Sequence, residues 1–152
     1  MIESVNYIAP LIPTATLQQA RGDAQRSKRH LVEVLADMTG LDQQVVMHSL
    51  GQSLHYPVLV MEDLNSLTAD FDAIDYSAAV ERTVIAFRNS ENQLIVVFSN
   101  PFDERLQNWT ENLISESFVW YLAQPSNISA FLSRQEEGMR AMDSILGPED
   151  DI

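Results

Sequence analysis

The chain has 152 residues, an apolar fraction of 45% and a formal net charge of −13. This length and composition are typical of one soluble globular domain with its own core. A strongly acidic chain is repelled by nucleic acid and by anionic lipid, so both are poor partners. The absence of cysteine excludes disulfides and thiolate chemistry, and no apolar run is long enough to span a membrane. We therefore predict a cytoplasmic protein.

The N-terminal part of the chain, about residues 14–56, predicts helices. A first helix follows Pro13 with a threonine as its N-cap and ends near Gly22. Two further helices meet at Gly40, and Asp42 is the expected N-cap of the second. They form a helical hairpin. The first helix of this hairpin carries apolar residues at the spacing of one helix face: Leu31, Val34, Leu35 and Met38.

A basic cluster lies between the first predicted helix and the hairpin. It contains Arg21, Arg26, Lys28 and Arg29, whereas residues 31–81 contain no lysine or arginine. Such a cluster is able to hold an acidic partner or a phosphate group, and Arg21, Arg26 and Arg29 are our candidate partner-binding residues. The alternative is an ordinary solvated helix face or loop.

An acidic segment follows over residues 62–75. Its dense carboxylates suit a hard cation such as calcium. The spacing does not match an EF-hand loop, and the alternative is an acidic linker between the helical part and the rest of the domain. Glu62 and Asp63 are our candidates for contact with a basic protein partner.

The C-terminal half predicts three strands, at residues 83–88, 93–99 and 117–122, because short runs of Val, Ile, Phe and Tyr are bounded by turn residues. The first two form a hairpin, and the second, apolar on both faces, is central. A helix after Pro101 returns the chain to the third strand, and its predicted buried stripe contains Leu106, Trp109, Leu113 and Ile114. We expect an α+β fold in which the helical hairpin region packs on a small three-stranded sheet with covering helices.

The expected organisation is one α+β domain over residues 1–135, with a helical part at about 14–56 and a sheet part at about 76–135. Residues 136–152 are the expected acidic linker or tail. Neither the sequence of a Walker A loop nor a recognised hydrolase or metalloprotease motif is present, so we expect no ATP hydrolysis, no catalytic residues, no cofactor and no metal site.

Two motifs carry a resemblance to a known family. They are Asn100-Pro101-Phe102-Asp103 after the second predicted strand, and Ala123-Gln-Pro-Ser-Asn-Ile128 after the third. Their order and spacing resemble the N-terminal domain of type II secretion and type IV pilus assembly ATPases, the GspE/PilB family, over roughly residues 8–135. Asn100 stands where that family usually has aspartate.

This resemblance implies a non-catalytic regulatory and docking domain. It implies a protein partner, the cytoplasmic domain of an inner-membrane platform protein, and therefore a location peripheral to the inner membrane without direct insertion. An alternative is the same domain attached to a non-ATPase such as a membrane glycosyltransferase.

Some members of the resembling family bind cyclic di-GMP through an Arg-Leu-Gly signature. The corresponding residues here are His30-Leu31-Val32, which lack the arginine and the glycine. Phosphate binding needs guanidinium or backbone donors and little bulk nearby. We therefore expect a nucleotide second messenger to be an unlikely partner, and keep a cyclic di-GMP-sensing module as the alternative function.

Overall fold

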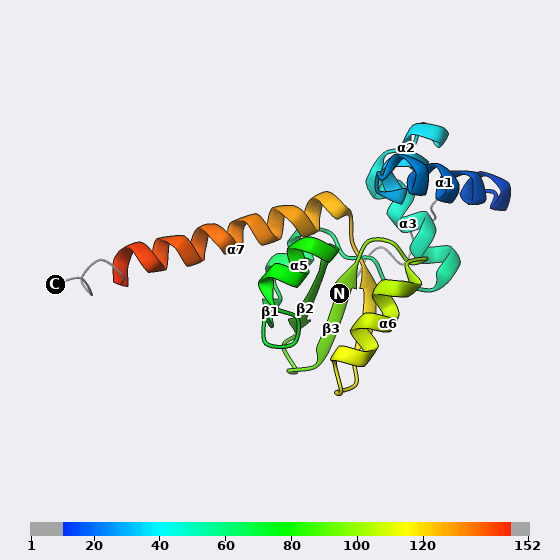
Figure 1. The fold of residues 1–152 in the computed structure, drawn as a ribbon. Helices are drawn as coiled ribbons and strands as arrows, with labels where there is room; N and C mark the ends of the chain where they lie inside the picture. Colours follow the sequence, from blue (N-terminus) through cyan, green and yellow to red (C-terminus); the bar gives the residue numbers. More distant parts are fainter. Residues whose placement is uncertain (1–10, 147–152) are drawn as a thin grey trace.

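A computed structural model describes residues 11–146 as an α+β fold, which confirms the predicted class (Figure 1). Residues 1–10 of the predicted domain and 147–152 of the predicted tail lie outside the described part. The elements in chain order are α1 (Thr14–Ser27), α2 (Leu31–Thr39), α3 (Gln43–Leu54), α4 (Met61–Asn65), β1 (Thr68–Ala69), α5 (Tyr76–Arg82), β2 (Val84–Arg88), β3 (Leu94–Phe98), α6 (Glu104–Leu113), β4 (Val119–Leu122) and α7 (Pro125–Leu146).

Helices α2 and α3 form the predicted hairpin. Gly40 has a φ of 74°, the left-handed conformation that favours glycine, and its N–H donates to the Ala36 carbonyl. The Asp42 side chain accepts a hydrogen bond of 3.0 Å from the N–H of Gln44, as expected of an N-cap. The predicted apolar face of α2 is buried except for Met38, which is 37% exposed at the end of the helix.

Helix α1 is longer than predicted. It passes through Gly22 and ends at Ser27, where Lys28 takes the left-handed conformation. A single glycine inside a helix costs only about 1 kcal/mol, and the helix-forming residues around it outweigh that cost. The predicted threonine cap is wrong, because Pro13 occupies the cap position without a side-chain hydrogen bond. Arg21 and Arg26 of the basic cluster are therefore helical, whereas Lys28 and Arg29 lie between α1 and α2.

The sheet has the order β1-β2-β3-β4. Strands β2 and β3 form the predicted antiparallel hairpin, and β3 pairs in parallel with β4 after the α6 crossover. All five residues of β3 are buried, which confirms it as an interior strand. The sequence predicted three strands and missed β1, which pairs Thr68 with Arg88 inside the supposed acidic linker. Two residues are too few to give an alternating pattern.

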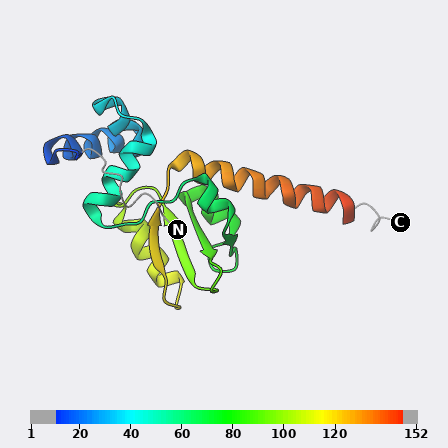
Figure 2. The ribbon, with the colours of Figure 1, turned by 180° about the vertical axis from the view of Figure 1, so that it is seen from behind.

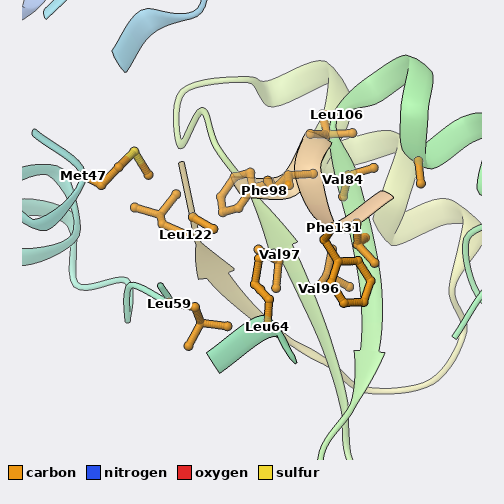
Figure 3. Packing of buried hydrophobic residues seen from close by; sticks show 14 of the residues in the cluster. Met47, Leu59, Leu64, Val84, Val96, Val97, Phe98, Leu106, Leu122 and Phe131 are labelled. Atoms are coloured by element: carbon orange, nitrogen blue, oxygen red, sulfur yellow. The ribbon is translucent and has the colours of Figure 1, made fainter. Parts of the chain in front are cut away.

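Aromatic side chains cover both faces of the sheet. Phe87 of β2 contacts Phe131 of α7 edge to face, with ring centroids 5.1 Å apart. On the other face Phe98 contacts both Tyr56 and Trp120, at 5.5 and 4.5 Å. Figure 3 shows Phe98 near Leu122 and Met47, so the core continues from the sheet into the helical part.

Helix α6 turns the predicted side to the core, with one exception. Leu106 and Ile114 are buried, but Leu113 is 50% exposed, so its predicted burial is wrong. Thr110 takes the inner position with 0% exposure, and its hydroxyl donates to the Leu106 carbonyl at 2.8 Å. A threonine that satisfies its own hydroxyl in this way fills a core position that hydrophobicity alone would not assign to it.

Arg88 joins three loops at one end of the sheet. Its guanidinium donates to Asp70 at 3.0 Å and to both carboxylate oxygens of Glu116 at 2.6 and 3.0 Å. Burial raises the pKa of Asp70, but the hydrogen bond from Arg88 and two backbone N–H donors outweigh it, so the net shift is downward. The Arg88 hydrogen bond likewise lowers the pKa of Glu116.

Helix α7 projects from the body on the side away from α1–α3 (Figures 1 and 2). Its first half is held by Tyr76, whose hydroxyl donates to the Leu132 carbonyl at 3.1 Å, and by Arg134, which donates to Asn65 at 2.7 Å. The helix continues without a break through the predicted domain boundary at residue 135.

Candidate functional site: an arginine-lined cleft

Two adjoining hollows lie where α1 and the start of α2 meet the loop between β3 and α6. Their volumes are about 660 and 430 Å³, and they share Arg29, Leu31, Asn100, Asp103 and Arg105. We call them together the arginine cleft. The loop follows the carboxyl end of β3, which is parallel to β4, and ligands of such sheets commonly bind beyond the carboxyl ends of the strands.

The cleft is basic in an acidic chain. Among the described residues, four arginines and three carboxylates line it, which gives a formal charge of +1 against −13 for the whole chain. All four guanidinium-bearing residues are exposed, so their donors are accessible to a ligand. The arginines are Arg21, Arg29, Arg82 and Arg105.

Two of these guanidinium groups lie over aromatic rings. The Cζ atom of Arg21 is 4.3 Å from the ring centroid of Phe102. The Cζ atom of Arg82 is 4.2 Å from that of Trp109. Cation–π contact restrains each guanidinium group, which reduces the rotamer entropy lost when a ligand binds.

Arg29 is held by two carboxylates of α2. Its Nη2 lies 2.8 Å from an Asp37 oxygen, and its Nε lies 3.4 Å from a Glu33 oxygen. The hydrogen bond and charge of Asp37 raise the pKa of Arg29 above its ordinary value, with a smaller contribution from Glu33. The guanidinium group is therefore charged and already partnered beside the cleft.

The loop before α6 is locally fixed. The Asn100 side chain accepts a hydrogen bond of 2.9 Å from the N–H of Phe102, and Asp103 accepts one of 3.0 Å from the N–H of Leu106. Asp103 is thus the N-cap of α6. These bonds hold the Phe102 ring where Arg21 packs on it. Asparagine at position 100 retains the acceptor that this turn uses.

The structure brings two of the five predicted partner-binding residues together in the cleft, Arg21 and Arg29. Arg26 points elsewhere on α1, pairs with Asp23 and has a side chain that is 73% exposed. Glu62 and Asp63 begin α4, which packs against α7, and the Asp63 carboxylate accepts a hydrogen bond of 2.9 Å from the N–H of Val60. Asp63 thus has a local structural role.

Sequence reasoning missed the other half of the cleft. Arg82 ends α5 and Arg105 begins α6, and neither belongs to the basic cluster. A signal was present, because a polar loop after a strand that leads into a crossover helix marks the carboxyl end of a parallel pair. Phe102 and Arg105 belong to that region.

His30, Leu31 and Val32, which stand where the family has its Arg-Leu-Gly signature, are divided between the cleft and the core. His30 and Leu31 line the smaller hollow. Val32 is 1% exposed and packs in the core of the helical part. Val32 lines neither hollow, so its side chain is not part of the cleft surface.

Within residues 11–146, no three histidine or acidic side chains come close enough together to hold a metal ion, including those of the acidic segment. In the same part of the chain, no helix combines the length and apolarity needed to cross a membrane.

Comparison with solved structures corrects one prediction. A structure of MshE with cdg, the abbreviation for cyclic di-GMP, has a TM-score of 0.60 to this chain at 23% identity, over 82% of this chain and 90% of that one. This shows a common fold. The prediction that a nucleotide second messenger is an unlikely partner is thereby contradicted. That prediction considered the arginine of one short sequence motif, whereas the arginines of the cleft come from four separate segments of the chain.

The family comparison agrees with the motifs. No curated protein matches the chain. The family model of the MshEN domain matches residues 54–142, which is more than half of the sequence and includes Arg82, Arg105 and the loop between β3 and α6. The resemblance to the N-terminal domain of GspE/PilB-type secretion and pilus-assembly ATPases is confirmed, and the chain belongs to the MshEN domain family.

Proposed function

We propose that this domain binds cyclic di-GMP in the arginine cleft and is the non-catalytic, ligand-sensing part of a secretion or pilus-assembly ATPase. The observation that carries the proposal is the gathering of four exposed arginines at one end of β3 in a chain of net charge −13. The shared fold with MshE, whose structure contains cdg, supports the same conclusion.

The chemistry of the cleft suits both parts of such a ligand. Cyclic di-GMP carries two negative phosphates, and arginine binds phosphate oxygens through two parallel N–H donors. Guanine presents two acceptors, O6 and N7, that the same fork can bind. The flat guanidinium group of Arg21, supported by Phe102, also offers a surface for stacking a base.

The size of the cleft is also suitable. Ligand sites commonly have volumes of about 300–1,000 Å³. The larger hollow alone, at about 660 Å³, lies within this range, and the adjoining hollow of about 430 Å³ extends it. A compact two-base ligand therefore fits across the region that the two hollows share.

Docking to an inner-membrane platform protein stays a prediction from the family resemblance. Ligand sensing and docking are compatible, since a bound ligand would join the helical part to the sheet and so influence whatever surface the partner contacts. The peripheral membrane location depends on that partner and stays a prediction with it.

Calorimetric titration of the purified chain with cyclic di-GMP tests the proposal. We expect saturable one-site binding that weakens about tenfold or more in Arg21→Gln, because a charged hydrogen bond and a stacking surface are lost. Arg26→Gln is the matched control, since it removes the same charge from the same helix outside the cleft, and its affinity should stay within about twofold of wild type. Cyclic di-AMP should bind more weakly.

Absence of any heat or thermal shift with cyclic di-GMP at high ligand concentration would overturn the proposal, because a specific ligand in large excess raises stability measurably. Equal losses in Arg21→Gln and Arg26→Gln would indicate attraction by overall charge and would remove the arginine cleft as the site.

A further inference from the structure

Arg29 lies between the arginine cleft and a separate hollow on the outer side of α1 and α2. This outer hollow has a volume of about 440 Å³, and Asp23, Arg26 and Asp37 are among its lining residues. Arg29 lines both regions, whereas Asp37 lines only the outer one. The side chain of Arg29 is 45% exposed, so close packing does not prevent its movement between the two regions.

The carboxylates that hold Arg29 come from one face of α2. Glu33 and Asp37 are one helical turn apart, and both contact the guanidinium group. Glu33 lies in the first turn, where a negative charge also suits the helix dipole. Asp37 lies beyond that turn, so the dipole does not account for its position, and its 2.8 Å contact with Arg29 is the stronger of the two.

We propose that Asp37, assisted by Glu33, is an internal competitor that holds Arg29 at the outer edge of the arginine cleft and so sets the affinity for an anionic ligand. This inference rests on the proposed function, since it concerns the same cleft. When a phosphate of cyclic di-GMP binds the guanidinium group of Arg29, that group leaves Asp37. Both the carboxylate and the phosphate satisfy the same planar donor fork, so the exchange replaces one charged partner with another.

The competition also predicts which variants tighten binding. An exposed ion pair contributes little to the free energy, so ligand binding needs only a modest gain to break it. Removal of the Asp37 charge leaves Arg29 available to the ligand before binding. Affinity should then increase by about two- to fivefold, the range that an exposed ion pair represents.

The test compares Asp37→Asn with Asp23→Asn in calorimetric titrations with cyclic di-GMP. Both substitutions remove one negative charge from the outer hollow, but Asp23 pairs with Arg26, which does not line the cleft. Any general electrostatic effect on an anionic ligand is therefore common to both variants. We expect binding about two- to fivefold tighter in Asp37→Asn than in Asp23→Asn, whose affinity should equal that of wild type within error.

Two further variants make the assignment specific. Glu33→Gln should tighten binding by less than Asp37→Asn, because its contact with Arg29 is longer, at 3.4 Å. In a chain that also carries Arg29→Gln, the substitution Asp37→Asn should have no further effect on affinity, as expected of coupled residues in a double-mutant cycle. Asp37 is 64% exposed, so its replacement should leave folding unchanged, and thermal unfolding checks this.

The outcomes separate the two ideas. Failure of the wild-type chain to bind cyclic di-GMP overturns the proposed function. Binding by the wild-type chain with equal affinities in Asp37→Asn and Asp23→Asn overturns the competitor and leaves the proposed function in place. Retention of the Asp37→Asn effect in the presence of Arg29→Gln also overturns the competitor, because the effect would then act through another group.

Discussion

The packing of α3 on the following segment depends on Gly51 having no side chain. A β-carbon at this position would lie 2.4 Å from Cγ2 of Val58 and 2.6 Å from the carbonyl oxygen of Tyr56. The Tyr56 N–H donates to the Gly51 carbonyl at 2.9 Å, and Leu59 a few residues later donates to Leu122 at 2.8 Å. The close approach thus fixes how the helical part joins β4.

The substitution Gly51→Ala combines two opposing effects. Alanine in a helix interior is favoured over glycine by about 0.8–1.0 kcal/mol. Overpacking of a filled site costs about 1–3 kcal/mol. The contact with Tyr56 is to a backbone oxygen, which cannot move aside as a flexible side chain can, so the upper half of that range applies. We expect a net loss of about 1–2 kcal/mol in the free energy of unfolding.

Gly138→Ala is the matched control. Gly138 lies in α7, and a β-carbon there would have no atom within 4 Å. Only the helix preference then remains, so the free energy of unfolding should rise by up to about 1 kcal/mol. Urea denaturation followed by circular dichroism gives both values, provided that the slope with denaturant is unchanged. A Gly51→Ala variant as stable as Gly138→Ala would refute the argument from close packing.

Two further predictions concern caps and charge. Asp42→Ala removes the bond to Gln44 and should lower the free energy of unfolding by about 1 kcal/mol in the same denaturation assay; an unchanged midpoint would show that the cap has no energetic role. In the folded protein the pKa values of Asp70 and Glu116 lie below their ordinary values of 3.8 and 4.5. The two carboxylates therefore stabilise the fold when the pH is above these ordinary values, and this stabilisation is lost as the pH falls through the lowered pKa values of the folded protein. Arg88→Gln should flatten this acid-dependent loss of thermal stability, and a profile parallel to wild type would contradict the role of Arg88.

Local patterns were sufficient for much of the fold. The helical hairpin follows from a 3.6-residue apolar period, a glycine stop and an aspartate cap, each of which acts within a few residues. The burial of β3 follows from a run of five apolar residues. These features were predictable because short-range interactions within the chain decide them.

Other features depended on contacts between distant segments. Strand β1 exists because Thr68 and Ala69 have β2 beside them, and two residues have no periodicity of their own. One inner position of α6 was assigned to Leu113 but belongs to Thr110, because the way the helix packs on the sheet selects which residues are buried. A threonine with an internal hydrogen-bond partner meets the requirement as well as an apolar side chain does.

The sequence by itself determined the α+β class, the glycine and aspartate caps of the helical hairpin, the interior strand and the excess of negative charge. Only the tertiary structure decided where the positive charges gather, because Arg21, Arg29, Arg82 and Arg105 come from separate segments and meet at the carboxyl end of β3. Electrostatic attraction for an anion is a sum over distances in space and not over positions in the sequence. A chain with a net charge of −13 can therefore still present a basic cleft.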